Sequence, residues 1–201
     1  MNKKIALFGT SADPPTTGHQ TIINWLSQHY DWVAVWASDN PMKVNQSCLS
    51  QRSAMLMISI EEINWRQNIR LHPELSSPRT LESVAKAKVQ WPEAELTLAI
   101  GSDLVRQLPR WYRVADLLPQ VKLLVVPRPG YTIDRAGLDR LLSMGAVVEI
   151  ANINAPAVSS TAYRERGDTK ALTRTIQDYI DRQQLYDVSR QQQASKQTTL
   201  S

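Results

Sequence analysis

The chain has 201 residues, a length that suits one substantial hydrophobic core and predicts a single main domain. Hydrophobic residues make up 42% and charged residues 21%, and no apolar run approaches the roughly 18 residues of a membrane span. The net charge of +4 comes from basic residues scattered among acidic ones, so neither nucleic acid nor a membrane is an expected partner.

The single cysteine, Cys48, cannot form an internal disulfide, and no Cys/His cluster has the spacing of zinc ligands. The start, "MNKKIALFG", lacks the long apolar segment of a signal peptide. These features favour a reducing, cytoplasmic setting and predict no metal site built by the protein itself.

Six short segments rich in apolar and β-branched residues follow one another along the chain. Several are apolar almost throughout, as are parallel strands that are covered on both faces. The segments lie at residues 4–10, 31–38, 68–75, 95–102, 121–128 and 146–152. Between them, apolar residues recur with helical spacing, as in "TIINWL", "QRSAMLMISI" and "LESVAKAKV". This alternation predicts an α/β fold with a doubly wound, Rossmann-like parallel sheet of about six strands.

The predicted domain covers residues 1–186. From Asp187 onward the sequence "DVSRQQQASKQTTLS" has no apolar face, which predicts a disordered tail over residues 187–201. In doubly wound sheets, ligands bind beyond the carboxyl ends of the strands. Polar motifs follow four of the predicted strands: "GTSADPPTTGH", "SDNPMK", "GSD" and "APAVSSTAYR".

The first motif, "GTSADPPTTGH", combines loop residues with a helix start. Gly9 permits a sharp turn, and Thr16 or Thr17 can cap a helix that begins near Gly18 and His19. Backbone N–H groups, the positive end of a helix and an imidazole then share one place, which favours a phosphate. Alone, such a motif is more often a capped helix with a structural histidine; its position after the first strand favours function. It matches neither the dinucleotide fingerprint nor a Walker loop.

The second motif is "VSSTAYR", residues 158–164. Ser159, Ser160 and Thr161 suit a helix cap and an anion, and Arg164 can hold phosphate oxygens with two parallel hydrogen bonds. Alone, it would be a helix cap with a solvated arginine. Two such places at one edge of the sheet favour a polyphosphate that bridges them.

Thr16-Thr17-Gly18-His19 is similar to the (His/Thr)-x-Gly-His signature of the nucleotidylyltransferases, and residues 158–164 resemble their Ile-Ser-Ser-Thr-x-x-Arg signature. Over residues 4–186 the chain most resembles the bacterial nicotinate mononucleotide adenylyltransferases. Matching segments include "NPMK", "SPRTLESV", "LAIGSDLVRQLPRWYRVADLL", "VVPRPGY" and "IQDYIDRQQLY". Thr16 and Met42 stand where this family usually has histidines.

The resemblance implies that ATP and nicotinate mononucleotide give deamido-NAD and pyrophosphate in NAD biosynthesis. In that reaction His19 would donate to the α-phosphate, the Thr16 hydroxyl would contact the triphosphate, and Lys43 would hold the attacking phosphate. Mg²⁺ bound with ATP would neutralise the leaving pyrophosphate.

The remaining site residues also follow from the resemblance. Asp103 would accept the ribose hydroxyls, with Gly101 allowing close approach. The β- and γ-phosphates would be held by Ser160, Thr161 and Arg164. The nicotinate ring would meet Thr80 and Trp111, with backbone donors near Tyr112. The other residues expected to bind ATP are Gly9, Thr10 and Gly18.

Three alternatives stay open at this stage. A related nucleotidylyltransferase acting on nicotinamide mononucleotide or another small phosphate would share both signatures. A nucleotide-binding sensor would bind ATP without releasing pyrophosphate. A nucleic-acid-binding module is the least favoured, because no stripe of aromatic and basic residues is present. Assembly into a homo-oligomer is compatible with the sequence but is not predicted by it.

Overall fold

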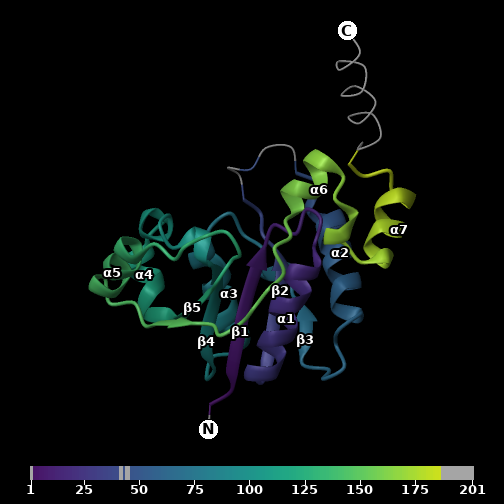
Figure 1. The fold of residues 1–201 in the computed structure, drawn as a ribbon. Coiled ribbons are helices and arrows are strands. Elements are labelled where there is room, and N and C mark those ends of the chain that lie inside the picture. The colour runs from purple at the N-terminus through teal and green to yellow at the C-terminus, as the bar shows by residue number, and fades with distance from the viewer. Residues whose placement is uncertain (1, 41–42, 44–45, 187–201) are drawn as a thin grey trace.

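The computed structural model describes residues 2–40, 43 and 46–186, which form a parallel six-stranded sheet (Figure 1). The strand order is β3-β2-β1-β4-β5-β6, the order of a doubly wound Rossmann-like sheet. The strands are β1 (Lys4–Thr10), β2 (Trp32–Ala37), β3 (Ile69–Leu71), β4 (Glu95–Gly101), β5 (Lys122–Val126) and β6 (Val148–Ile150). The predicted fold class and all six predicted strands are confirmed. Met42 and the predicted tail lie outside the described residues.

Seven α-helices and five short 3-10 helices connect the strands within the described ranges. The α-helices are α1 (Thr17–His29), α2 (Leu49–Glu61), α3 (Thr80–Gln90), α4 (Val114–Leu117), α5 (Arg135–Ser143), α6 (Ser160–Arg166) and α7 (Arg174–Arg182). The 3-10 helices are η1 (Pro73–Leu75), η2 (Ser102–Leu104), η3 (Leu108–Arg110), η4 (Leu118–Gln120) and η5 (Thr169–Ala171). None of the helices in the described part of the chain has the length and apolar character that a bilayer crossing requires.

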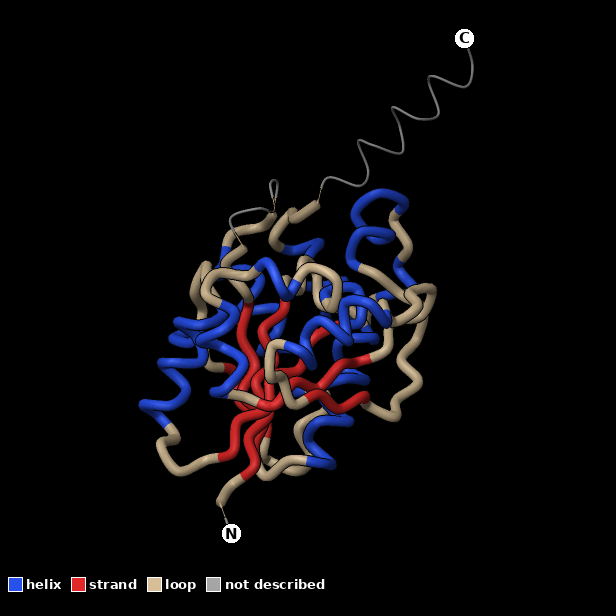
Figure 2. Tube along the Cα trace, turned by 90° about the vertical axis from the view of Figure 1, so that its left-hand side faces the viewer, coloured by secondary structure: helices blue, strands red, loops and turns tan. Residues whose placement is uncertain are grey.

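Alternate residues of each central strand face opposite sides of the sheet, and both sides are covered (Figure 2). In β1, Ile5 and Leu7 pack into the cluster that includes α3, α4 and α5. Ala6 and Phe8 pack into the cluster that includes α1 and α2. Because both faces of the strand are buried, its sequence reads as a continuous apolar run.

A smaller third cluster joins α2, α6 and α7 beside the sheet. It contains Met55 of α2, Tyr163 of α6, and Ile176 and Ile180 of α7, each at most 2% exposed. Figure 1 shows the three helices side by side near the carboxyl end of β1. This cluster therefore brings the last described residues of the chain close to the loop that follows β1.

The strand order reverses between β1 and β4, which are neighbours although α1, β2, α2, β3 and α3 lie between them in the chain. A crevice beyond the carboxyl ends of these two strands is the usual ligand site of such a sheet. The loop after β1 holds residues 11–16, and the segment after β4 begins with η2. Both carry residues that the sequence predicts to bind ATP.

Candidate active site

The loop after β1 ends in a cap that holds the His19 ring in place. Thr16 is the N-cap of α1, and His19 is the third helical residue. The Thr16 backbone N–H donates to His19 Nδ1 at 3.0 Å, and the Thr16 hydroxyl lies 2.8 Å from the same atom. A backbone N–H can only donate, so Nδ1 accepts and the neutral ring carries its proton on Nε2. His19 thus presents one fixed donor away from the cap.

The electrostatic surroundings keep that ring neutral. Burial, followed by the positive charges of Arg128 and Lys43, lowers the pKa of His19 from 6.5 to about 4. At neutral pH the imidazole is therefore uncharged and its Nε2–H remains in place. Thr16 is only 3% exposed, and its hydroxyl lies within hydrogen-bond distance of the ring. It therefore helps to hold the orientation of the histidine.

The second motif folds onto the first. Ser159 is the N-cap of α6 and accepts from the Ala162 amide at 3.0 Å. The Ser160 hydroxyl donates to the Pro14 carbonyl at 2.7 Å, and the Arg164 guanidinium donates to the Asp13 carbonyl. Two motifs that lie about 145 residues apart in the chain therefore form one surface, as their common position at the sheet edge predicts.

Two cations, Arg128 and Lys43, act on His19, and Lys43 in turn has Arg164, Asp103 and Asp13 as charged neighbours. Lys43 Nζ donates to Ser11 Oγ at 2.8 Å, and Arg128 donates to Asp103 at 2.9 Å. Partial burial and then the Arg164 guanidinium lower the pKa of Lys43, while Asp103 and Asp13 oppose that change. Arg164 and Arg128 both disfavour the charge of Lys43, and a polyanion bound beside these cations would relieve that repulsion.

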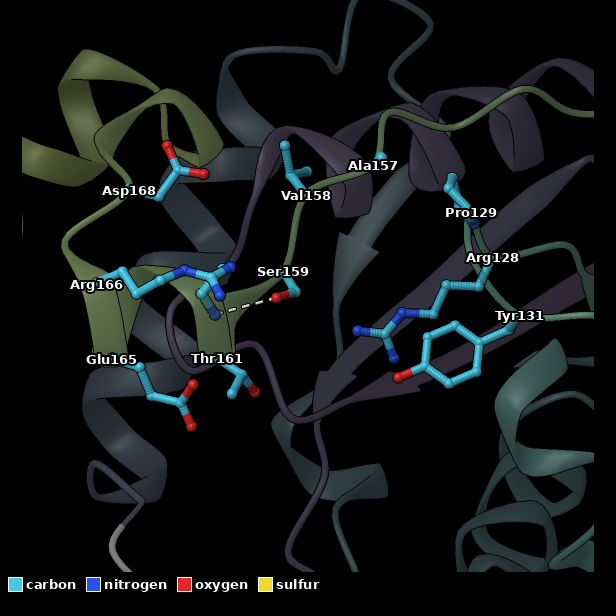
Figure 3. Close-up of a pocket in the computed structure, with 11 residues that line it drawn as sticks. Arg128, Pro129, Tyr131, Ala157, Val158, Ser159, Thr161, Glu165, Arg166 and Asp168 are labelled. Carbon is cyan, nitrogen blue, oxygen red and sulfur yellow. Dashed lines mark hydrogen bonds between the residues drawn. The ribbon is translucent and has the colours of Figure 1, made fainter.

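A cavity of about 390 Å³ opens beside this group, between the segment after β5 and α6 (Figure 3). Arg128 and Tyr131 lie on one side, and Thr161, Glu165 and Arg166 lie on the other. The remaining lining residues are Pro129, Ala157, Val158, Ser159, Ala162 and Asp168. Its volume falls in the range of small-molecule sites, and its walls offer both charge and an aromatic ring.

The predicted glycines have close neighbours, but not all for the expected reason. Gly9 lies inside β1, and a Cβ there would come within 2.6 Å of the Trp36 ring, so packing explains this glycine rather than the predicted sharp turn. Gly18 faces Val158, where a Cβ would meet Cγ2 at 3.3 Å, so the two motifs approach closely. At Gly101 a Cβ would lie 2.4 Å from Asp103 Oδ1. Thr10 is the last residue of β1.

The residues expected to meet the nicotinate ring form a second group, on the face that α3 covers. Thr80 is the first residue of α3, and Arg79 before it stacks over the Tyr112 ring at 4.0 Å. Trp111 is partly buried against the core cluster of this face, and Tyr112 is 48% exposed. The structure thus brings Thr80 and the Trp111-Tyr112 pair to one region.

Three residues at the site are absent from the residues that the sequence predicts. Asp13 and Arg52 are 1% and 3% exposed, and Arg128 lies against Asp103. Asp13 sits within the first motif and Arg128 within "VVPRPGY", so their positions beside predicted loops were the available signal. Arg52 lies in "QRSAMLMISI", which resembles the Arg-x-x-Met-Leu helix of the family, but no role was predicted for it because one arginine in an amphipathic helix reads as a surface residue.

No group of three or more His, Cys, Asp or Glu side chains converges within the described ranges. Asp13 and Asp103, the carboxylates nearest the site, already accept hydrogen bonds from protein donors. The donor set therefore fits a magnesium ion that is held mainly by phosphate oxygens and water, as Mg²⁺ is in many nucleotide sites.

Comparison with known families agrees with this geometry. Residues 7–166, which include both motifs, match the cytidylyltransferase-like family. The chain therefore belongs to that family.

Named relatives narrow the assignment. The probable nicotinate-nucleotide adenylyltransferase of Synechocystis sp. is 41% identical over 91% of this chain and 98% of its own. The nicotinate-nucleotide adenylyltransferase of Bacillus subtilis is 27% identical over 92% of this chain and 99% of its own. Within its family, the protein is a member of the nicotinate-nucleotide adenylyltransferases.

Solved structures share the fold. The nicotinic acid mononucleotide adenylyltransferase of Plasmodium falciparum complexed with NaAD superposes with a TM-score of 0.80 at 21% identity, covering 93% of this chain and 98% of that one. The same enzyme complexed with APC gives a TM-score of 0.76 with the same coverage. At this identity the likeness concerns the fold.

Proposed function

We propose that the protein transfers the adenylyl group of ATP to nicotinate mononucleotide, forming deamido-NAD and pyrophosphate in NAD biosynthesis. The observation that carries the proposal is the fixed Nε2–H of His19 among Lys43, Arg128 and Arg164, at the crevice between β1 and β4. A phosphate oxygen of the mononucleotide attacks the α-phosphorus, the bond from that phosphorus to the bridging oxygen breaks, and pyrophosphate leaves. No covalent enzyme intermediate is needed.

The protein's task is to align two anions and offset their repulsion. His19 donates from Nε2 to the α-phosphate as charge builds there, with Thr16 positioning the ring. Lys43 holds the attacking phosphate. Thr161 and Arg164 hold the β- and γ-phosphates, together with Ser160 at the start of α6.

The adenosine part of ATP belongs in the cavity beside α6. Asp103 accepts the ribose hydroxyls, and Arg128, which is paired with it, contributes charge at the same place. Tyr131 lines the wall of the cavity that faces α6, and its ring offers an aromatic surface to the adenine base. Gly9, Thr10, Gly18 and Gly101 keep the strand ends and loops close to the nucleotide.

The nicotinate end of the acceptor lies at the second group of residues. Trp111 stacks on the ring, while the Thr80 hydroxyl and backbone N–H groups near Tyr112 donate to the carboxylate. Donors without a matching acceptor suit an acid better than an amide.

Mg²⁺ accompanies ATP and supplies charge neutralisation at the leaving pyrophosphate. The substrates are the only partners that we propose. The reaction and the single cysteine suit the reducing cytoplasm.

The test is pyrophosphate release from ATP with nicotinate mononucleotide, nicotinamide mononucleotide or phosphopantetheine as acceptor. Pyrophosphate release with nicotinate mononucleotide alone supports the proposal. Release with another acceptor would assign the protein to a related class of nucleotidylyltransferase. ATP binding without pyrophosphate release would indicate a sensor. His19→Ala should reduce turnover by roughly 10²–10³-fold, because losing one preorganised donor costs about 2.7–4 kcal/mol. Turnover near that of the wild type in a folded variant would remove His19 from the mechanism.

A further inference from the structure

A buried carboxylate connects four parts of the chain next to the loops that we propose to bind phosphate. Asp13 is 1% exposed, and both of its carboxylate oxygens lie 3.3 Å from the Ser47 backbone nitrogen, which donates to them. The Tyr186 hydroxyl donates to Asp13 Oδ1, and Arg164 lies 3.9 Å from Oδ2. The loop after β1, the segment before α2, α6 and the end of the domain therefore meet at one side chain.

Both backbone polar groups of Ser47 are hydrogen-bonded to buried charged side chains. While Asp13 binds its amide, Arg52 of α2 donates to its carbonyl at 2.9 Å. The Arg52 guanidinium, which is 3% exposed, also donates to the carbonyls of Ser11 at 3.1 Å and Ser38 at 2.8 Å. Lys43 lies in the chain between Ser38 and Ser47, and these buried charges bind the backbone of both serines.

The end of the domain reaches this network through α7. The Tyr186 ring packs edge-on against Tyr163 with 5.9 Å between centroids, within the cluster that joins α7 to α2. Burial and the hydrogen bond to Asp13 raise the pKa of the Tyr186 hydroxyl far above its ordinary value, so it remains a donor. Its φ of 55° is in the left-handed region, which a tyrosine adopts only where its surroundings require it.

A buried carboxylate requires its donors, because an unpaired one is costly. If the Tyr186 hydroxyl is removed, the carboxylate keeps the Ser47 amide as a hydrogen-bond donor and the Arg164 guanidinium as an ion-pair partner at 3.9 Å. Either the Arg164 side chain moves closer to Asp13, away from the phosphates, or the Ser47 backbone shifts and Lys43, which precedes it in the chain, moves as well.

We propose that Tyr186 is a positioning residue for adenylyl transfer: through Asp13 it sets where Arg164 and Lys43 lie relative to the phosphates of ATP and of the mononucleotide. The proposal rests on the proposed function, and it adds a residue from the end of the domain, 173 positions from Asp13, to the residues that determine turnover.

The test compares Tyr186→Phe with Tyr179→Phe, a matched loss of one hydroxyl from the same cluster. In Tyr186→Phe, kcat/KM for ATP and for the mononucleotide should fall about tenfold, the usual effect of losing one hydrogen bond to a charged group. Tyr179→Phe should stay within about twofold of wild type. Equal kcat/KM in the two variants, or a fall in melting temperature without a fall in kcat/KM, would overturn the proposal.

A double-mutant cycle separates positioning from general damage. In an Asp13→Asn background, Tyr186→Phe should change kcat/KM less than twofold, since its target charge is absent. If Asp13→Asn does not fold, Arg164→Lys serves as the background, and the effect of Tyr186→Phe on the KM of ATP should shrink there. A full tenfold effect in both backgrounds would contradict the route through Asp13. Inactivity of the wild type with nicotinate mononucleotide would instead contradict the proposed function.

Discussion

His19 illustrates how a single hydrogen bond decides what a residue can do. In a capping box, a side chain at the third helical position accepts from the N-cap amide, a place usually taken by Glu or Gln. Here an imidazole takes it, so the same bond that starts α1 also fixes the tautomer. The sequence predicts the helix start and the histidine, but not this coupling, which depends on the ring's orientation.

The pKa of His19 leads to a prediction about stability. Its value of about 4 in the folded protein lies below the 6.5 of an unfolded chain, so between these values the unfolded state binds the extra proton. The free energy of unfolding should therefore be at its full value above pH 6.5 and fall as the pH drops toward 4. By pH 5 the loss from this one group is up to about 2 kcal/mol.

Urea unfolding at pH 7.5 and pH 5 measures this effect in the wild type and in His19→Gln. The variant should lose less stability between the two pH values, because His29 and His72 are common to both proteins. An identical pH dependence in the two proteins would mean that His19 titrates normally.

Among the elements, the strands were predictable because both of their faces are buried, so the apolar runs are continuous. The range 68–75 was too long: β3 ends at Leu71, and Pro73, which has no N–H, begins a 3-10 helix. The segment "DLVRQL" after β4 reads as the start of a helix, yet only the short η2 forms there. Pro109 prevents such a helix from continuing, because its ring would clash with the carbonyl of Val105.

Helix α7 carries a prediction of its own. Ile176 is 1% exposed in the cluster that joins α7 to α2 and α6, so Ile176→Ala should lower the free energy of unfolding by roughly 2–4 kcal/mol. Val89→Ala on α3, where the side chain is 84% exposed, should change it by less than about 0.5 kcal/mol. Denaturant midpoints of the two variants measure the difference. A cost for Ile176→Ala as small as that of the control would show that α7 is not docked.

At the scale of the whole molecule, the site is assembled from segments that no local pattern connects. Their common position was predictable, since motifs that follow parallel strands meet at one edge of the sheet. The contacts of Arg164 with Asp13, and of Tyr186 with the same residue, were not predictable, because periodicity and propensity describe only neighbouring residues. Arg128 was missed for a related reason: its role depends on its pairing with Asp103, which is 25 positions away.

The two groups of candidate site residues lie on different parts of the molecule, and under the proposed function this separation bears on specificity. The cations lie on the segments after β2 and β5 and on α6, whereas Trp111 and Thr80 lie on the side of α3. A change at Trp111 should therefore affect the mononucleotide far more than ATP. We expect Trp111→Ala to raise the KM for nicotinate mononucleotide by about 5- to 150-fold, as the loss of one stacked ring of about 1–3 kcal/mol predicts, and that for ATP less than threefold.

The same region should discriminate the acid from the amide. The two mononucleotides differ only in the ring substituent, and the donors expected there, the Thr80 hydroxyl and backbone N–H groups near Tyr112, pair with a carboxylate and leave an amide NH₂ without an acceptor. The ratio of kcat/KM for nicotinate over nicotinamide mononucleotide should be well above one in the wild type and should decrease in Thr80→Val. Trp111→Ala is the contrasting variant, because a stacked ring supports both substrates and its removal should leave the ratio nearly unchanged. Equal efficiency with both mononucleotides in the wild type would place the protein among enzymes that accept either form, and would remove Thr80 from the recognition of the carboxylate.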